Sequence, residues 1–380
     1  MRVLTVVGAR PQFIKAAPVS RALGRAGIEE VLVHTGQHYD RGMSQIFFEE
    51  MGIREPDINL EVGSGLHGWQ TGQIMVRLEK VLQEEKPDWV LVYGDTNSTL
   101  AGALVAAKLQ LRVAHVEAGL RSFNRAMPEE INRIVADHLS SLLLCPSRVA
   151  VSNLSAEGIR EGVHAVGDVM YDALLEYSAE ADKRSSILQR IKVEPKHYLL
   201  LTIHRAENTD DPERLRAVLK ALANLDSTVV FPVHPRALKA LAAAGFVSLS
   251  SPVDDEMQAA RLTLDELSLD HIRLIEPLGY LDMMNLARHA RTVLTDSGGL
   301  QKEAYWLGVP CVTLREETEW VETVEAGWNV LAGTDAARIT DALRSFKAPG
   351  GEATRNLYGE PGASERCVRV LQGARPEPGH

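Results

Sequence analysis

Three carboxylates and one histidine lie in short polar clusters of this 380-residue chain: Asp95, Glu117, Glu129 and His204. These are residue types that transfer protons in general acid-base catalysis. Carboxylates crowded together raise one another's pKa, and desolvation raises it further, which suits abstraction of a proton from carbon. Taken singly, each is more simply a cap or an ion-pair partner, and Asp95 before Thr96 could cap a helix. The joint placement favours a catalytic group.

Cationic side chains follow the first apolar run, in Gly8-Ala9-Arg10-Pro11-Gln12 and at Lys15. The spacing matches neither the G-x-G-x-x-G of a dinucleotide loop nor the G-x-x-x-x-G-K-[ST] of a P-loop. NAD, FAD and P-loop ATP are therefore not expected. A turn into a helix that carries Arg10 and Lys15 suits a diphosphate, because it offers backbone N–H groups and two cations. The alternative is that both are solvated surface charges.

A second small-residue turn, Ser297-Gly298-Gly299, follows an apolar run near residue 295 and opens a helical pattern. Small residues let phosphate oxygens approach the backbone donors at a helix start. Glu303 lies about two turns further along that helix and could accept hydrogen bonds from ribose hydroxyls. The alternative is a glycine-rich helix start with a solvent-facing Glu303.

Potential metal ligands lack the spacing of a metal site. They are the histidines His34, His38, His67 and His115 and the cysteines Cys145, Cys311 and Cys367. We expect the histidines to be polar loop residues and the cysteines to be small core residues, without a disulfide. No metal and no nicotinamide cofactor is predicted.

These clusters follow short β-branched runs that alternate with helical patterns, as in a parallel sheet. The predicted strands of the first half are residues 3–7, 31–35, 89–93, 113–116 and 142–145. Those of the second half are residues 198–202, 229–233, 272–275, 292–295, 309–314 and 329–331. In doubly wound sheets, ligands bind beyond the carboxyl ends of the strands. The fold class is therefore α/β with two Rossmann-like doubly wound domains, and polar clusters from both are expected to face one cleft.

The length supports two domains. We place them at residues 1–170 and 171–362, with a helix at 363–372 and a disordered tail from 374 onward. The composition, 45% hydrophobic and 24% charged, is that of a soluble globular protein. A net charge of −10 argues against nucleic acid or anionic lipid as a partner. The apolar runs are too short for a membrane span or a signal peptide, so a cytoplasmic location is expected.

The ordered motifs resemble those of the non-hydrolysing UDP-N-acetylglucosamine 2-epimerases, over nearly all of residues 1–372. In the first half they are Gly8-Ala9-Arg10-Pro11, Gly36-Gln37-His38-Tyr39-Asp40, Gly94-Asp95-Thr96-Asn97, His115-Val116-Glu117-Ala118-Gly119-Leu120-Arg121 and Pro128-Glu129-Glu130-Ile131-Asn132-Arg133. In the second half they are His204-Arg205-Ala206-Glu207-Asn208, Asp296-Ser297-Gly298-Gly299-Leu300-Gln301 and Ala363-Ser364-Glu365-Arg366.

The resemblance implies a glycosyltransferase-B-like architecture, a homodimer, and a C-terminal helix that returns to the first domain. It places Asp95, Glu117, Glu129 and His204 at the family's catalytic positions. Its UDP-binding positions fall on Arg10, Lys15, Ser297, Gly298, Gly299 and Glu303. Ala9 and Gln12 depart from the family's usual Thr and Glu. Ala206 and Trp320 replace arginines of bacterial members, so strong activation by a second substrate molecule, as in those enzymes, is not expected.

The activity that the resemblance implies is reversible C2 epimerisation of UDP-N-acetylglucosamine to UDP-N-acetylmannosamine through 2-acetamidoglucal, without a cofactor. We favour Asp95 and Glu117 as proton-transfer groups. The alternatives are a 2-epimerase of a UDP-diacetamido-uronic acid, a UDP-sugar glycosyltransferase on the same scaffold, a hydrolysing epimerase and a non-enzymatic UDP-sugar sensor.

Overall fold

The computed structural model describes residues 1–37, 54–223, 225–248, 261–264, 267–349 and 357–374. The chain folds into two compact units. Unit 1 comprises Met1–Tyr177 and Asn356–His380, and unit 2 comprises Ser178–Arg355. The division falls inside helix α7 (Val169–Arg184). The domain limits expected from the sequence stay a prediction.

Unit 1 contains a seven-stranded parallel sheet with the strand order β3-β2-β1-β4-β5-β6-β7. Its strands are β1 (Arg2–Val7), β2 (Glu29–His34), β3 (Ile58–Asn59), β4 (Trp89–Tyr93), β5 (Val113–Val116), β6 (Leu142–Cys145) and β7 (Val163–Ala165). The chain order reverses between β1 and β4, and such a switch point is where doubly wound sheets bind ligands.

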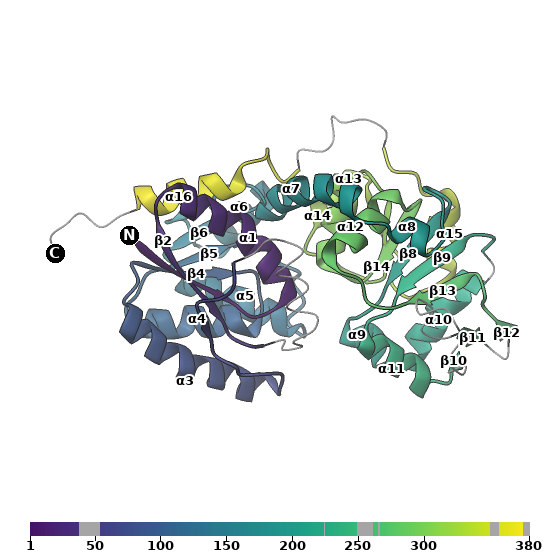
Figure 1. Ribbon diagram of the computed structural model, residues 1–380, viewed down its shortest axis with the longest axis horizontal. Helices are drawn as coiled ribbons and strands as arrows, with labels where there is room; N and C mark the ends of the chain where they lie inside the picture. The colour runs from purple at the N-terminus through teal and green to yellow at the C-terminus, as the bar shows by residue number, and fades with distance from the viewer. Residues whose placement is uncertain (38–53, 224, 249–260, 265–266, 350–356, 375–380) are drawn as a thin grey trace. The chain divides into compact units, whose positions relative to one another are not determined.

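Helices cover both faces of this sheet. Those in the described part are α1 (Arg10–Arg25), α3 (His67–Glu85), α4 (Asn97–Lys108), α5 (Pro128–Leu139), α6 (Arg148–Ala156) and α16 (Ala363–Gly373). Figure 1 shows α1 and α16 side by side on one face and α3, α4 and α5 on the other. All five residues of β4 are buried, as expected of a central strand that is covered on both faces.

Unit 2 contains a second parallel sheet, with six strands in the order β13-β9-β8-β14-β15-β16. These strands are β8 (Tyr198–Thr202), β9 (Thr228–Pro232), β13 (Ile272–Ile275), β14 (Thr292–Thr295), β15 (Cys311–Thr313) and β16 (Asn329–Leu331). A small antiparallel sheet is formed by β10 (Val247–Ser248), β11 (Arg261–Leu264) and β12 (Leu267–Ser268).

The helices of unit 2 pack on both faces of the six-stranded sheet. They are α8 (Ile187–Arg190), α9 (Ala206–Thr209), α10 (Pro212–Ala223), α11 (Pro235–Ala243), α12 (Tyr280–His289), α13 (Gly298–Leu307), α14 (Val321–Glu325) and α15 (Ala336–Ser345). Alternate residues of strand β8 belong to the hydrophobic cores on opposite faces of the sheet. Leu199 and Leu201 pack with α10, α11 and α15, whereas Tyr198 and Leu200 pack with α8, α12 and α13, because successive side chains point to opposite faces.

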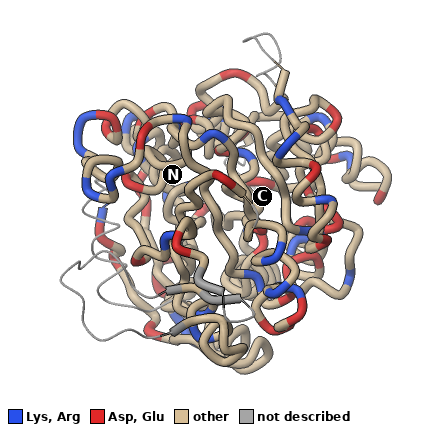
Figure 2. Tube along the Cα trace, turned by 90° about the vertical axis from the view of Figure 1, so that its right-hand side faces the viewer, with Lys and Arg blue, Asp and Glu red and all other residues tan. Residues whose placement is uncertain are grey.

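Every strand predicted from the sequence is present, although β15 is shorter than residues 309–314 because Pro310 cannot donate to the ladder. The three cysteines are free and buried, as predicted. Burial raises the pKa of the Cys145 and Cys311 thiols to about 12. Across the described residues no helix combines the length and the hydropathy that a bilayer crossing requires. Figure 2 shows acidic and basic residues intermixed along the chain.

Candidate active site

Asp95 and Glu117 lie at the carboxyl ends of neighbouring strands of unit 1. Strand β4 pairs in parallel with β5, with Tyr93 opposite Val116. The turns that follow both strands therefore meet at one edge of the sheet. A Cβ atom added to Gly94 would lie 3.1 Å from both Oε2 of Glu117 and Nζ of Lys15. The turn that carries Asp95 therefore lies against Glu117, and a shared site for the two carboxylates stays a prediction.

Glu117 is buried, and its carboxylate forms an ion pair with Lys15 of α1. Its backbone is left-handed, with φ at 70°, a conformation that a non-glycine residue adopts only when its surroundings impose it. The hydrogen bond from its N–H to the carbonyl of Leu144, at 3.0 Å, is one such constraint. The site therefore holds Glu117 in an unfavourable conformation with a cation against its carboxylate.

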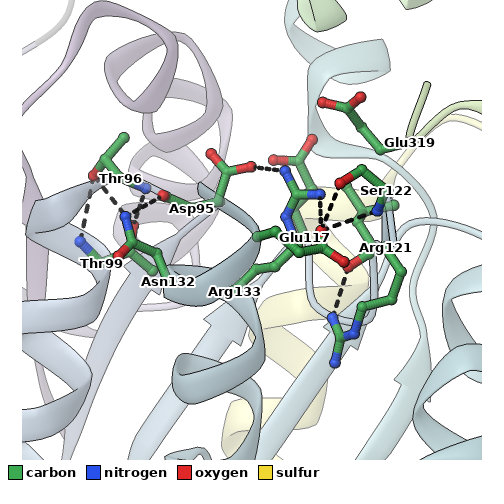
Figure 3. A network of polar contacts seen from close by, with 12 residues as sticks. Asp95, Thr96, Thr99, Glu117, Arg121, Ser122, Asn132, Arg133 and Glu319 are labelled. Atoms are coloured by element: carbon green, nitrogen blue, oxygen red, sulfur yellow. Dashed lines mark hydrogen bonds and ion pairs between the residues drawn. The ribbon is translucent and has the colours of Figure 1, made fainter. Parts of the chain in front are cut away.

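Asp95 is held from α5. Its carboxylate forms an ion pair with Arg133, and Nδ2 of Asn132 donates to its carbonyl oxygen at 2.9 Å. Figure 3 shows Arg133 between Asp95 and the loop that carries Ser122. Thr96 and not Asp95 is the cap of α4, because the Thr96 side chain accepts from the N–H of Thr99. The simple capping interpretation of Asp95 is therefore wrong.

Arg133 extends this network into the loop after β5. Its Nη1 donates to Oε2 of the buried Glu130 at 2.8 Å. Glu130 in turn accepts hydrogen bonds from the N–H and hydroxyl of Ser122 and from the N–H of Phe123, at 2.9 to 3.0 Å. Buried charges are stable when they are paired and hydrogen-bonded in this way. The network fixes both Asp95 and the loop at residues 122–123.

The electrostatic partner of Asp95 and of Glu117 is a cation, and not another carboxylate as the sequence suggested. Glu129 is half-buried at the start of α5, and in the described part of the chain it has no hydrogen-bond or ion-pair partner. Lys15, which stays a predicted diphosphate ligand, is paired with Glu117 in this structure. Attraction to cations therefore replaces mutual repulsion as the main charge interaction of Asp95 and Glu117.

The turn between β1 and α1 differs from the expected phosphate cradle. Oε1 of the buried Gln12 accepts from the N–H groups of Gly8 and Ala9, at 2.8 and 3.1 Å. Nε2 of Gln12 donates to the carbonyl of Tyr93 at 2.9 Å. These two backbone donors are therefore occupied, which corrects the prediction that they are open to phosphate. The side chain of Arg10 is outside the part that the structure describes.

In unit 2, His204 follows β8 and is held by Asp296, which follows β14. The His204 and Arg205 N–H groups donate to the buried Asp296 carboxylate at 3.0 to 3.1 Å, and Nδ1 of His204 lies 3.2 Å from its Oδ1. Asn208 adds a hydrogen bond at 3.1 Å. Because Asp296 occupies Nδ1, the other ring nitrogen of the 42% exposed His204 side chain is left for a substrate.

The turn at Ser297-Gly298-Gly299 has the expected helix-start geometry. Ser297 caps α13, and no described residue accepts a hydrogen bond from the N–H of Gly298 or Gly299. Gly299 is exposed. Glu303 is half-buried and accepts a hydrogen bond from the Tyr280 hydroxyl at 3.1 Å. Open amides at the start of a ten-residue helix suit an anionic group.

Asp296→Asn is expected to destabilise the protein at neutral pH and much less in acid. Burial alone would raise the pKa of Asp296, but hydrogen bonds and the charge of His204 lower it overall. The contribution of a carboxylate with a lowered folded pKa is complete above its unfolded pKa, about 3.9, and disappears as the pH falls through the folded value. Losing hydrogen bonds to a charged group costs about 1.5–3 kcal/mol.

Urea unfolding of parent and variant at pH 7, 5 and 3 measures this difference. A gap in unfolding free energy that stays constant down to pH 3 would contradict the assignment. Asp335→Asn is a control, because Asp335 caps α15 at the exposed surface.

Among the described residues, no group of three or more His, Cys, Asp or Glu side chains could hold a metal ion. His34 is buried beside Phe13, and His67 lies within hydrogen-bond distance of Asn97. His38 and its neighbours Tyr39 and Asp40 lie outside the described residues.

Sequence reasoning assigned no role to several residues that hold the site: Gln12, Asn132, Arg133, Tyr280 and Asp296. One signal could have found part of this set. Glu130, Arg133 and Asp137 recur at helical spacing and are all buried in α5. A polar stripe on the buried face of a helix indicates a network, because buried charges need partners.

The chain matches known proteins over nearly its whole length. A family model described as UDP-N-acetylglucosamine 2-epimerase matches residues 21–372. A protein of Methanococcus maripaludis, named as a homologue of that enzyme, is 48% identical and aligns over 98% of this chain and 99% of its own. A UDP-2,3-diacetamido-2,3-dideoxy-D-glucuronate 2-epimerase of Pseudomonas aeruginosa is 44% identical, with the same coverage of both chains.

A solved structure has the same fold. The crystal structure of Methanocaldococcus jannaschii UDP-GlcNAc 2-epimerase in complex with UDP-GlcNAc and UDP is 42% identical, with a TM-score of 0.86. The match covers 98% of this chain and 100% of that one. The predicted fold class, α/β with two Rossmann-like doubly wound domains of the glycosyltransferase-B type, is confirmed.

Proposed function

The chain belongs to the UDP-N-acetylglucosamine 2-epimerase family, and on that basis we propose that it interconverts UDP-N-acetylglucosamine and UDP-N-acetylmannosamine. The observation that carries the proposal is the pair of carboxylates at adjacent strand ends, each beside a cation. Carboxylates so placed are able to take a proton from, and return a proton to, a sugar carbon.

The first step is an elimination. A carboxylate, Asp95 or Glu117, takes the proton at C2, and the electron pair of the broken C–H bond forms the C1=C2 double bond. The bond between C1 and the β-phosphate oxygen breaks, and its electron pair leaves with UDP. The products are 2-acetamidoglucal, UDP and a protonated carboxyl group.

The second step reverses the first on the other face of C2. A carboxyl group returns a proton to C2 as the UDP oxygen attacks C1, and all atoms and charges are recovered. Because two faces must be served, we assign proton transfer to Asp95 and Glu117 together: one takes the C2 proton and gives it up to the other, directly or by exchange with solvent, and the second group then returns a proton to C2. Glu129 tunes the proton transfer by these two groups or relays protons to them.

Leaving-group stabilisation supplies much of the rate. A proton at C2 of a sugar is not acidic, so the developing charge on the departing diphosphate must be stabilised. We assign this role to Arg10, Lys15, the hydroxyl of Ser297 and the amides of Gly298 and Gly299. The amide of Ser297, also expected to face the phosphate, instead donates to Oγ1 of Thr295 at 2.9 Å. His204 orients or protonates the diphosphate, an assignment supported by its Nδ1 contact with Asp296. No metal or nicotinamide takes part in this scheme.

A second UDP-sugar is a candidate for the substrate. A crystal structure that the chain resembles contains UDP-GlcNAc, whereas the relative from Pseudomonas aeruginosa acts by its name on a diacetamido-glucuronate. The uronate carries an acetamido group in place of the 3-hydroxyl and a carboxylate in place of the 6-hydroxymethyl group, so its site would need a cation for that carboxylate. Rates with both UDP-sugars, compared as kcat/KM, separate them: a preference for the uronate would reject our substrate assignment.

Other enzyme classes are distinguished by products. A hydrolysing epimerase would release free N-acetylmannosamine irreversibly, and a glycosyltransferase would leave the C2 proton in place. A UDP-sugar sensor would bind without turnover. Our proposal requires reactions started from UDP-N-acetylglucosamine and from UDP-N-acetylmannosamine to reach the same equilibrium mixture of the two.

We also propose that the protein is a homodimer and that it binds neither nucleic acid nor a membrane. The large apolar side chains Leu66, Trp69 and Val76, at the start of α3 and on it, are 84%, 51% and 56% exposed. Trp69 and Val76 are two helical turns apart and so lie on the same side of α3, and exposed apolar side chains that gather on one face can mark a protein interface. Sedimentation equilibrium measures the mass directly, and a monomer across the micromolar range would reject the dimer.

Glu303→Ala is expected to weaken UDP binding by about tenfold or more and to change kcat little. Hydrogen bonds to a charged group contribute about 1.5–3 kcal/mol, and ribose contacts are the same in the ground and transition states. Tyr280→Phe removes only the hydroxyl that supports Glu303, so its effect on UDP affinity should be smaller. Calorimetric titration with UDP and steady-state kinetics test both, and an unchanged KM with a reduced kcat would contradict the role of Glu303.

A further inference from the structure

His115 is fully buried on β5, between the two turns that carry Asp95 and Glu117. Its Nε2 lies 2.7 Å from the carbonyl oxygen of Gly94, the residue before Asp95. Its Nδ1 lies 2.7 Å from Oδ1 of Asp137 on α5. The ring therefore joins the turn after β4 to helix α5.

Both ring nitrogens of His115 face acceptors. A peptide carbonyl cannot donate, so Nε2 carries a hydrogen. Asp137 also accepts from the N–H of Gly119 at 3.1 Å and from Nη1 of Arg121 at 2.7 Å. Burial alone would raise the pKa of Asp137, but His115 and Arg121 lower it overall, so this carboxylate is charged. Nδ1 therefore faces an acceptor as well, and both ring nitrogens are placed to donate.

Arg121 connects Asp137 to a second carboxylate. Arg121 makes two further hydrogen bonds to the carboxylate of Glu157, at 2.6 and 2.7 Å. Asp137 therefore belongs to a group of hydrogen-bonded charged side chains, and such a group is stable in a protein interior only when its members are paired.

The bond to Gly94 acts where the backbone is most constrained. Gly94 has φ at 60°, and a side chain there would press against Glu117 and Lys15. Within the described residues, a single backbone bond links this turn to β5, from the N–H of Gly94 to the carbonyl of Val116 at 3.0 Å. Nε2 of His115 adds a second tie, on the carbonyl side, directly before Asp95.

We propose that His115 is a positioning residue, a buried double donor that fixes the Gly94-Asp95 turn against Glu117 so that both carboxylates keep their places. The inference rests on the proposed epimerase function. Displacing a reacting group by about 1 Å can cost on the order of 10²-fold in rate. Loss of the tie should therefore lower kcat without weakening the binding of UDP.

Two matched variants separate positioning from packing. In His115→Gln the amide nitrogen can occupy the place of Nε2 and still donate to Gly94. In His115→Asn it can occupy the place of Nδ1 and donate only to Asp137. Both variants remove the imidazole ring and leave one of its two acceptors without that donor. We expect His115→Gln to keep kcat within about tenfold of the parent and His115→Asn to lose on the order of 10²-fold, with KM retained in both.

Equal kcat values for the two variants at equal stability, or a loss confined to KM, would overturn the proposal. A parent protein that epimerises no UDP-sugar would instead reject the proposed function. The parent also permits a test that needs no variant. With nitrogen-15-labelled histidine, one ring should show two protonated nitrogens with slowly exchanging hydrogens at neutral pH, and the absence of such a ring would overturn the assignment of His115.

Discussion

Asp95→Asn is expected to lower kcat by about 10² to 10⁴-fold while UDP affinity changes little. This is the usual contribution of a general acid-base group, which acts mainly in the transition state. The variant keeps the size of the side chain and an oxygen that can accept from Arg133, whose ion pair with Asp95 becomes a neutral hydrogen bond. The fold should therefore survive, and the loss should be chemical.

The measurement combines steady-state kinetics with calorimetric titration of UDP. Glu129→Gln is a useful comparison, because Glu129 belongs to the same motif yet has no partner in the described part of the chain; its loss of kcat should be the smaller one. An Asp95→Asn protein with parent kcat would remove Asp95 from the proton-transfer group.

Glu117→Gln is expected to cause a loss of the same order, about 10² to 10⁴-fold in kcat. Glu117 is buried in a left-handed conformation and paired with Lys15. The amide cannot accept the C2 proton. A variant that stalls after elimination should also release 2-acetamidoglucal and UDP, because the intermediate waits longer for its proton.

Lys15→Met, alone and combined with Glu117→Gln in a double variant, shows whether Lys15 and Glu117 act as a unit. If Lys15 serves only Glu117, the double variant should be hardly slower than Glu117→Gln alone, since residues in contact are not additive. If Lys15 also binds the diphosphate, Lys15→Met should weaken UDP binding whether or not Glu117 is present. Parent rates of C2 proton exchange in Glu117→Gln would reject its catalytic role.

The sheets could be predicted from sequence because their central strands are continuous apolar runs, as at residues 89–93. Strands β3, β7, β10, β11 and β12 could not, since they are short and mix polar with apolar residues, without the continuous apolar run that marks β6 at similar length. Runs that short carry no readable alternation. Their pairing depends on neighbours that are distant in the chain.

The candidate site could be predicted in position but not in its pairings. Asp95 and Glu117 follow predicted strands, so their meeting at one sheet edge follows from topology. That Lys15 pairs with Glu117, or that Gln12 fills the first turn, depends on side-chain directions. Spacing carries no information on these. The partner of a buried charge is set by the fold, and the network of Arg133 and Glu130 shows how much of a site lies outside its motifs.

Hydrogen exchange at C2 tests the central claim most directly. Purified protein is incubated with UDP-N-acetylglucosamine in D₂O, and proton NMR follows the C2 position of both the recovered substrate and the product. The proposed elimination and re-addition predicts that deuterium enters C2 of UDP-N-acetylmannosamine and, through the reverse reaction, C2 of the recovered UDP-N-acetylglucosamine. Epimerisation in which C2 keeps its original proton and gains no deuterium would contradict the account, and so would turnover that forms no epimer.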